Sequence, residues 1–574
     1  MNFFAAQDKA RQASRRLVGA YVLATVLIVA GVTFIVGFAL FSFSDPGYAY
    51  TPREFIAYNS GLLIATALLT TLFILGASMF KTAALSSGGG AVARQMGGTL
   101  VATDVQDPLR RRLRNVVEEM AIASGVPVPE IYVLEEESGI NAFAAGFTPS
   151  DAAVAVTRGA LELLDRNELQ GVIAHEFSHI LNGDMRLNIR LMGVLFGIMV
   201  LGLIGRLIVR GGYHTSLVTS RRDRSAPVIL IVGFGLAILG GIGMFFARII
   251  KAGVSRQREY LADASAVQFT RQSVGIANAL KKIGGYSHGS RIEATDPEEV
   301  SHMLFGSGSR LVGLFATHPP LVERIQALDP SFRESDFPQL DRRSYRGDVR
   351  DSDDAAAAFA GGVTTALASG GAQVLAESIA ETVGRPETEH VEYARHLRPS
   401  IPAALYDATH SPEYANLLAI ALILDRSGRI VDRQLAIVRD QLGSQRERLL
   451  RQYYEQLSNT GAEFRLPLLE IAFPALKKRP DPELSFLVAL ATRLIEVDGR
   501  IDLYEYCFYR IMMSNLGQAV DPTGGRRARR ARRKDLRSAA IGLLRILADY
   551  GHDDEDTRRA AFETGIATLG DWGK

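Results

Sequence analysis

Residues 171–184 read GVIAHEFSHILNGD, a segment in which two histidines stand four positions apart and a glutamate follows the first. On an α-helix, positions i and i+4 share a face, so the imidazoles of His175 and His179 can reach one metal ion. Glu176 then stands beside that metal, where it can take a proton from water. The apolar flanks predict a buried helix, and burying these three side chains without partners is costly. We therefore favour a metal site over two histidines on an exposed helix face.

A catalytic metal of this kind needs a third protein ligand and one open position. The candidate is Glu259, in the segment RQREYLADA at 256–264. Asp263 shares its helical face, so one carboxylate can bind the metal while the other orients a ligand imidazole. An ordinary surface helix with Arg/Glu pairs explains the same spacing, and the residues alone leave both interpretations open.

The composition restricts both the ligands and the partners. Cys507 is the single cysteine among 574 residues, which excludes intrachain disulfides and a metal site built from thiolates. Any metal must then be held by imidazole and carboxylate. The net charge of +2 gives no overall field that would favour nucleic acid. With 47% hydrophobic residues and a mean hydropathy of +0.09, the chain must bury much apolar surface, which excludes disorder as its overall state.

The hydrophobic residues are concentrated in four uncharged runs, at 17–43, 55–80, 191–205 and 225–247. At 1.5 Å per residue, the first, second and fourth can span a hydrocarbon core of about 30 Å, whereas the third is marginal in length. The first two runs predict a transmembrane hairpin. The last two predict a second hairpin, inserted between the predicted metal ligands. Buried core helices of a large soluble protein are the alternative, with more weight for the third run.

Basic residues near the ends of the runs indicate orientation. Four precede the first run and a cluster follows the second, while the loop between them holds only Arg53. Because cytoplasmic segments carry the excess of Lys and Arg, both ends of the first hairpin are expected at the cytoplasmic face of an inner (cytoplasmic) membrane. The connecting loop of the second hairpin is also basic. That hairpin is either shallow or partly re-entrant, or the first pair dominates the topology.

The remaining segments predict the domain organisation. Residues 1–90 form the N-terminal hairpin, and residues 91–190 and 251–335 form the metal-binding domain, interrupted by the hairpin at 191–250. Within that domain an amphipathic helix is expected at 112–123 and short strands at 131–134, 140–147 and 152–157. Residues 336–390 are an acidic, Ala/Gly-rich connector. Residues 391–574 show helical spacing with few strand signals, which predicts an all-α domain.

Five segments together resemble the HtpX-like membrane zinc metallopeptidases, which are relatives of the CAAX prenyl endopeptidases. These segments are NAFA at 141–144, VAVTRG at 154–159, AHEFSHILNGD at 174–184, SRQREYLAD at 255–263 and THPPLVERI at 317–325. With the four apolar runs, the resemblance covers about residues 15–330. The set is far more specific than the His-Glu-x-x-His motif alone.

This resemblance implies one zinc ion (Zn2+) per chain, bound by His175, His179 and Glu259. It also implies that Glu176 is the general base and that Asp263 orients a metal-binding side chain without binding the metal itself.

The resemblance further implies a substrate site and an additional catalytic group. The residues Asn141, Ala142, Phe143 and Ala144 look like an edge strand that pairs with the extended backbone of a substrate. His318 is similar in position to a residue that stabilises the oxyanion of the reaction. A surface or helix-capping histidine is the alternative for His318.

The C-terminal part gives weaker signals. The segment DGRIDLYE at 498–505 mimics half of an EF-hand loop, but the first ligand position would be Leu494, so calcium binding is not expected. It is similar to a helix-turn-helix of TerB-like α-helical domains. The segment DRSGRIVD at 425–432 echoes it, which suggests a repeated helical unit.

Seven basic residues between Arg526 and Lys534 have three interpretations. They form a solvated loop that enters a helix, contact anionic lipid headgroups, or bind nucleic acid. The last is the least favoured, because no aromatic residues interleave them.

Taken together, the sequence predicts a mainly α membrane protein with a zincin-like α/β catalytic domain containing a small sheet, two transmembrane hairpins and an all-α C-terminal domain. The expected function is that of a zinc-dependent endopeptidase that cleaves membrane or misfolded proteins at the cytoplasmic face. Its expected partners are protein or peptide substrates and the lipid bilayer, without nucleic acid; oligomerisation stays open. The alternatives are a narrow-specificity processing protease and a membrane scaffold with a vestigial metal site. A vestigial site need not keep Glu176, which argues against the scaffold.

Overall fold

The computed structural model describes residues 3–43, 51–85, 88–102, 106–215, 225–270, 273–286, 289–290, 304–305, 318–339, 388–426, 428–499, 503–520, 533–551 and 554–568. The chain folds as two compact units, Met1–Ile401 and Pro402–Lys574. Most of the predicted connector and the arginines at 526–532 lie outside the described residues.

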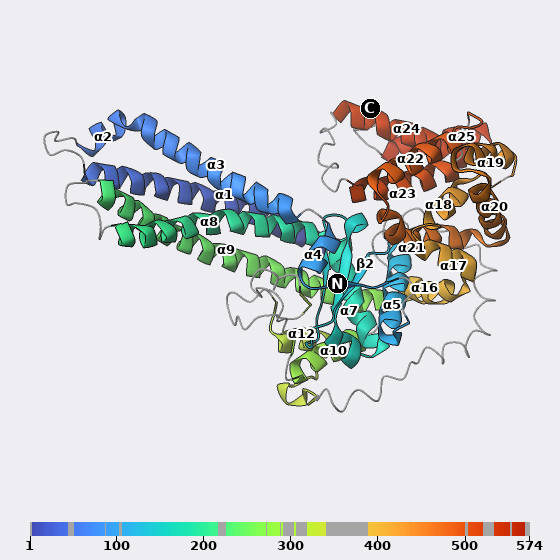
Figure 1. The fold of residues 1–574 in the computed structure, drawn as a ribbon, viewed down its shortest axis with the longest axis horizontal. Coiled ribbons are helices and arrows are strands. Elements are labelled where there is room, and N and C mark those ends of the chain that lie inside the picture. The colour runs from blue at the N-terminus through green and yellow to red at the C-terminus, as the bar shows by residue number, and fades with distance from the viewer. Residues whose placement is uncertain are drawn as a thin grey trace. The chain divides into compact units, whose positions relative to one another are not determined.

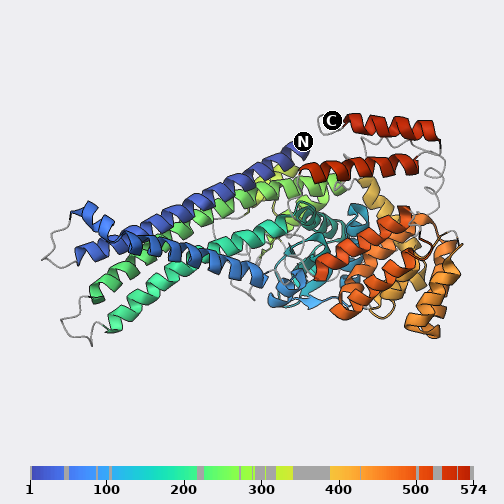
Figure 2. The same cartoon turned by 90° about the horizontal axis from the view of Figure 1, so that it is seen from above.

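Four long helices form a bundle in the first unit (Figure 1): α1 (Phe3–Ser42), α3 (Ser60–Leu85), α8 (Asp184–Thr215) and α9 (Ser225–Thr270). Helix α8 packs against α9 and α3, and α1 packs against the same two helices. The view from above shows the four running alongside one another (Figure 2). A short helix, α2 (Pro52–Tyr58), precedes α3 and begins with a capping box between Thr51 and Glu54.

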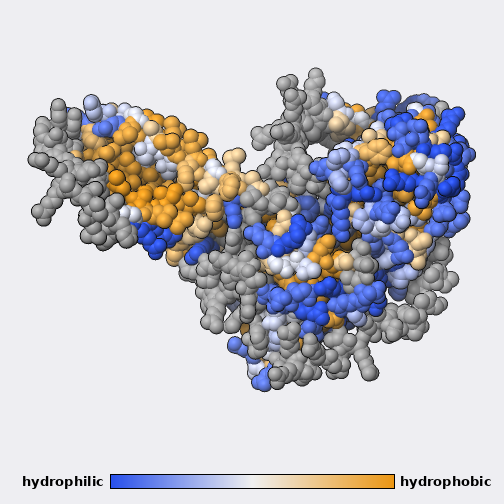
Figure 3. Space-filling model, viewed as in Figure 1, coloured by the Kyte–Doolittle hydropathy of each residue, from blue (hydrophilic) through white to orange (hydrophobic). Residues whose placement is uncertain are grey.

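The surface of this bundle is apolar. Phe34 and Leu69 are 70% and 67% exposed, and Figure 3 shows hydrophobic surface gathered over these helices. Within the described residues, three segments are long and apolar enough to cross a membrane: Val22–Ser42, Ser60–Ala83 and Val228–Phe246. Helix α8, which holds the run of marginal length, is not among them. Exposed apolar helices of this length need a lipid environment, so the prediction of a mainly α membrane protein is confirmed.

A four-stranded sheet with the order β1-β2-β4-β3 lies in the same unit. Strands β2 (Glu130–Leu134) and β4 (Ala153–Thr157) pair in parallel, while β1 (Thr99–Leu100) and β3 (Ala142–Ala145) flank them antiparallel. The three predicted strands are present, and β1 is an addition. Both inner strands are fully buried along most of their length, as their runs of Val, Ile and Ala favour.

Shorter helices complete the first unit: α4 (Gly89–Gln95), α5 (Pro108–Ser124), α6 (Arg158–Leu163), α7 (Arg166–Leu181), α10 (Ser273–Gly285), α12 (Leu321–Leu328) and α16 (Thr388–Ser400). Of these, α4, α6 and α7 pack against the sheet. The predicted amphipathic helix is α5, which ends at Gly125 in the left-handed region. Helix α16 packs against α5, and Arg398 pairs with the buried Glu118 at 2.6 Å. Residues 391–400, expected with the C-terminal domain, thus pack in the first unit.

The described residues of the second unit form helices: α17 (Ala403–His410), α18 (Ala415–Ile423), α19 (Val431–Leu442), α20 (Ser444–Asn459), α21 (Arg465–Lys477), α22 (Asp481–Ile495), α23 (Leu503–Val520), α24 (Arg533–Gly551) and α25 (Glu555–Thr568). The two similar segments noted in the sequence follow α18 and α22, and each has a glycine at positive φ, Gly428 and Gly499. The side chain of Gln434 on α19 donates to the carbonyl of Leu494 near the end of α22, which links these two helices.

Candidate metal centre and active site

Helix α7 carries the His-Glu-x-x-His segment. Asp165 caps its N-terminus in a reciprocal capping box with Glu168, which fixes where the helix begins. At Gly171 an added Cβ would lie 2.7 Å from the backbone nitrogen of Ile276, so a glycine is required for the close approach to α10. The helix is thereby buried with His175 on its inner face.

Helix α9 supplies the third group. It runs without interruption from Ser225 to Thr270, so one helix contains both the apolar segment Val228–Phe246 and the pair Glu259 and Asp263. Helix α9 packs against α7, which brings the predicted ligands from both helices together.

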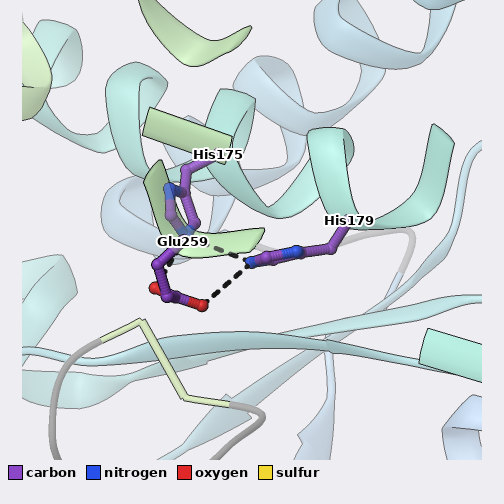
Figure 4. A group of neighbouring side chains, drawn as sticks. All are labelled: His175, His179 and Glu259. Carbon is purple, nitrogen blue, oxygen red and sulfur yellow. Dashed lines mark hydrogen bonds and ion pairs between the residues drawn. The ribbon is translucent and has the colours of Figure 1, made fainter. Parts of the chain in front are cut away.

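The side chains of His175, His179 and Glu259 converge on one point (Figure 4). The two Nε2 atoms are 3.2 Å apart, and each lies 3.6 Å from a different carboxylate oxygen of Glu259. Nitrogen and oxygen atoms that bind one zinc ion tetrahedrally at about 2.0–2.2 Å lie about 3.3–3.5 Å from one another. The donor set and its spacing therefore fit a single metal ion.

Each imidazole is oriented by an aspartate on its far side. The Nδ1 atom of His175 lies 2.9 Å from Asp263 Oδ1, and Nδ1 of His179 is hydrogen-bonded to Asp184 Oδ2 at 2.8 Å. A carboxylate behind Nδ1 keeps the proton there and leaves Nε2 free to bind a metal. Asp263 was expected in this place from the sequence.

Asp184 was not predicted as a site residue. Helix α7 ends at Leu181, Gly183 follows with φ +68°, and α8 begins at Asp184. The left-handed glycine turns the chain so that Asp184 faces back to His179. The sequence feature that could have indicated this role is Asn-Gly-Asp at 182–184, two residues after the second histidine.

Glu176 is buried beside the two histidines. Among the described residues, no side chain is hydrogen-bonded to its carboxylate. Burial raises the pKa of Glu176, and the charges of His179 and His175 and the backbone of Ala144 offset the effect in part. A buried carboxylate that no side chain holds suits a group that takes up and releases a proton during a reaction.

Histidine side chains surround the carboxylate of Glu259. Nδ1 of His318, buried just ahead of α12, lies 3.0 Å from Glu259 Oε2, so the structure brings His318 to the third ligand. Burial alone would raise the pKa of Glu259, but His318 and His175 lower it well below its usual value. Burial likewise opposes protonation of His175, but its contacts with Asp263 and Glu259 raise its pKa to about 9. The centre therefore favours a cation between these carboxylates.

The predicted substrate strand, β3, lies at one edge of the sheet. The carbonyl of Asn141 accepts from the N–H of Thr157 in the neighbouring strand, so Ala142 and Ala144 turn their backbone groups outward. The chain itself uses part of this edge. The N–H of Phe305 donates to the carbonyl of Ala142 at 2.8 Å, and Leu304 lies opposite Phe143.

Comparison with known proteins agrees with this geometry. Residues 108–331 match peptidase family M48. A protein described as a protease HtpX homologue from Dictyoglomus thermophilum is 42% identical over 39% of this chain and 71% of its own length. Another from Thermoanaerobacter pseudethanolicus is 40% identical over 38% of this chain and 70% of its own length.

A third protease HtpX homologue, from Listeria monocytogenes, is 36% identical over 47% of this chain and 87% of its own length. No solved structure matches the chain. Both the matched segment and the convergent histidines and glutamate lie in the first unit. The chain belongs to peptidase family M48, as an HtpX-like membrane metallopeptidase.

Proposed function

We propose that this protein is a zinc-dependent endopeptidase that cleaves membrane or misfolded proteins at the cytoplasmic face of the membrane. The convergence of two Nε2 atoms and a buried carboxylate at ligand spacing, with a buried glutamate beside them, carries this proposal. No other group of three such side chains was found within the described residues.

Glu176 is the proposed general base and acid. Zinc held by His175, His179 and Glu259 would supply Lewis acidity, which polarises a carbonyl and lowers the pKa of water. Glu176 then takes the proton of the attacking water and returns it to the amine that leaves. Its burial serves this role, because a raised pKa makes the carboxylate a better proton acceptor near neutral pH.

The outward groups of Ala142 and Ala144 are the proposed backbone partners of the substrate. Pairing through the main chain reads sequence weakly, which suits a protease for varied unfolded segments. Because Phe305 donates to the carbonyl of Ala142, a substrate that pairs along this whole edge must displace that contact. Because Leu304 lies opposite Phe143 on the same edge, a substrate that pairs at Ala144 must displace that bridge as well.

The site is proposed to act on chain segments that emerge from the bilayer. Glu259 follows Phe246 by thirteen positions on one continuous helix, which is about 20 Å at 1.5 Å per residue. The basic residues around the first hairpin favour the cytoplasmic side for this end of the helices.

The test compares wild type with Glu176→Gln, both purified in detergent with zinc. The variant is expected to keep its zinc and to lose casein cleavage by about 10²–10⁴-fold, because the general base is removed while the ligands stay. Glu162→Gln is the control, since Glu162 pairs with Arg158 away from the metal centre. Wild-type cleavage by Glu176→Gln refutes the mechanism. If both proteins bind zinc and neither cleaves casein, the result favours the alternative function, a membrane scaffold with a vestigial metal site.

A further inference from the structure

The side chain of Arg324 is buried and contacts Asp263, the aspartate that lies against His175. The guanidinium of Arg324, from α12, donates through Nε and Nη2 to the two oxygens of Asp263, at 2.8 and 2.7 Å. Its Nη1 donates to the carbonyl of Phe305 at 2.8 Å. Asp263 Oδ1 is also the oxygen nearest to His175 Nδ1. A two-point contact of this kind prevents rotation of the carboxylate, so the imidazole is held in one plane.

The second histidine has the same arrangement. Asp184 uses Oδ2 for His179, and its other oxygen forms an ion pair with Arg258. Arg258 directly precedes the ligand Glu259 on α9, whereas Asp184 is the first residue of α8. The pair therefore joins the two helices of the inserted hairpin at the metal centre. Arg258 is the more accessible arginine, with 13% of its side chain exposed against 1% for Arg324.

The two arginines also balance charge. The centre buries four carboxylates, those of Glu176, Asp184, Glu259 and Asp263. Against them stand the two guanidinium groups of Arg324 and Arg258, so the carboxylates outnumber the arginines and the centre favours an added cation. Loss of either arginine would leave a buried carboxylate with neither its positional restraint nor its counter-charge, which is costly in a low-dielectric environment.

We propose that Arg324 and Arg258 are positioning residues, which act through Asp263 and Asp184 to orient the histidines and so set the affinity of the centre for a divalent metal. This inference rests on the proposed metal-dependent function. An arginine suits the place of Arg324 better than a lysine, because its planar fork holds both oxygens of Asp263.

The experiment measures zinc affinity by competition with a chelator, on the full-length protein in detergent. Arg324→Gln is expected to weaken zinc binding about 10–100-fold, and Arg258→Gln by about 10-fold, because its side chain is less buried. Arg166→Gln is the matched control. Arg166 lies on α7, the helix of the two histidines, and forms a buried ion pair with Glu119 at 2.6 Å. Arg166 does not contact the metal centre. This control should lower the melting temperature in chelator and leave the zinc affinity unchanged.

The outcomes separate the two proposals. If wild type binds no zinc, the proposed function fails. If wild type binds zinc and both variants at Arg324 and Arg258 bind it equally well, the positioning role is refuted. An equal loss of affinity in Arg166→Gln also refutes it, because a general loss of packing would then explain the effect.

A double variant tests whether Arg324 acts through Asp263. Adding Arg324→Gln to Asp263→Asn should lose much less zinc affinity than Arg324→Gln loses in the wild-type background, because only the longer ion pair of Arg324 Nη1 with Glu259 Oε2, at 3.6 Å, then remains to be lost. Additive losses contradict the proposal. If Arg324→Gln does not fold, Arg324→Lys and Arg258→Gln serve instead. The lysine, which keeps the charge and loses the fork, should show an intermediate loss, and an unchanged affinity in both variants refutes the role.

Discussion

The two ends of helix α9 are built for opposite environments. Near its start the helix exposes large apolar side chains, such as Phe234 at 61%. Further along it buries Glu259 and Asp263, which are 2% and 4% exposed. In a water-soluble domain the apolar residues would be inside and the charged ones outside. One helix thus passes from a segment that requires lipid to a segment that requires charge partners.

The two ends are also held by different contacts. In the bundle, α8 and α9 approach through glycines, and a Cβ added to Gly240 would lie 2.3 Å from the Cα of Gly202. Close backbone contact between small residues is the usual means of packing helices where lipid removes the hydrophobic driving force. At the metal centre, by contrast, the ion pair of Asp184 with Arg258 joins the two helices. The same two helices are therefore fixed by shape at one end and by charge at the other.

The largest effect is expected from breaking the shape-based contact. Gly240→Leu must push α8 and α9 apart, and both helices carry site residues, Asp184 and Glu259, at their far ends. The added side chain meets backbone atoms, so no change of rotamer relieves the overlap and the helices themselves must move. We expect reduced zinc occupancy and more than about tenfold slower casein cleavage, since small misplacements of catalytic groups are costly. Both quantities are measured on the purified protein.

Gly241→Leu is the control for that variant, because an added Cβ there has no atom within 4 Å. It should behave as wild type. If both variants retain full activity, the contact in the bundle does not position the site.

An intermediate effect is expected from placing a charge on an exposed apolar residue. Leu69→Lys lies in the middle of the span Ser60–Ala83 and should cost about 2.5–3.5 kcal/mol of insertion free energy. Val274 on α10 is similarly exposed, at 63%, so Val274→Lys should cost little. The yield of membrane-integrated protein measures both. Equal yields would mean that the two exposed residues face the same solvent.

Much of the catalytic domain could be predicted because the necessary information is local. His175, Glu176 and His179 require only the geometry of one helix, and the strands β2 and β4 are short β-rich runs between turns. The spacing of Glu259 and Asp263 left the third ligand open, and only the resemblance to the HtpX-like peptidases implied Glu259. Strand β1 was missed because two residues are too few to show a pattern of alternation.

The remaining contacts depend on how distant segments meet. Arg324 is 61 positions from Asp263, and Leu304 meets Phe143 across the sheet edge, so no periodic pattern indicates either contact. Asp184 depends on the turn at Gly183. In each case the residue type was visible in the sequence, but its partner was set by the tertiary fold.

The smallest effect concerns a buried carboxylate in the second unit. The carboxylates of the metal centre have arginines and histidines around them, whereas burial raises the pKa of Glu470 on α21 well above 4.5. A carboxyl group whose pKa is higher in the folded state contributes stability that is present below its unfolded pKa and is lost as pH rises through the folded value. Glu470→Gln removes this dependence. The amides of α21 should exchange more slowly in the variant than in wild type at about pH 8, and at a similar rate in both proteins at about pH 4.5. Hydrogen exchange of α21 measures this, and a gain that is equal at both pH values would show that the charge of Glu470 is not the cause.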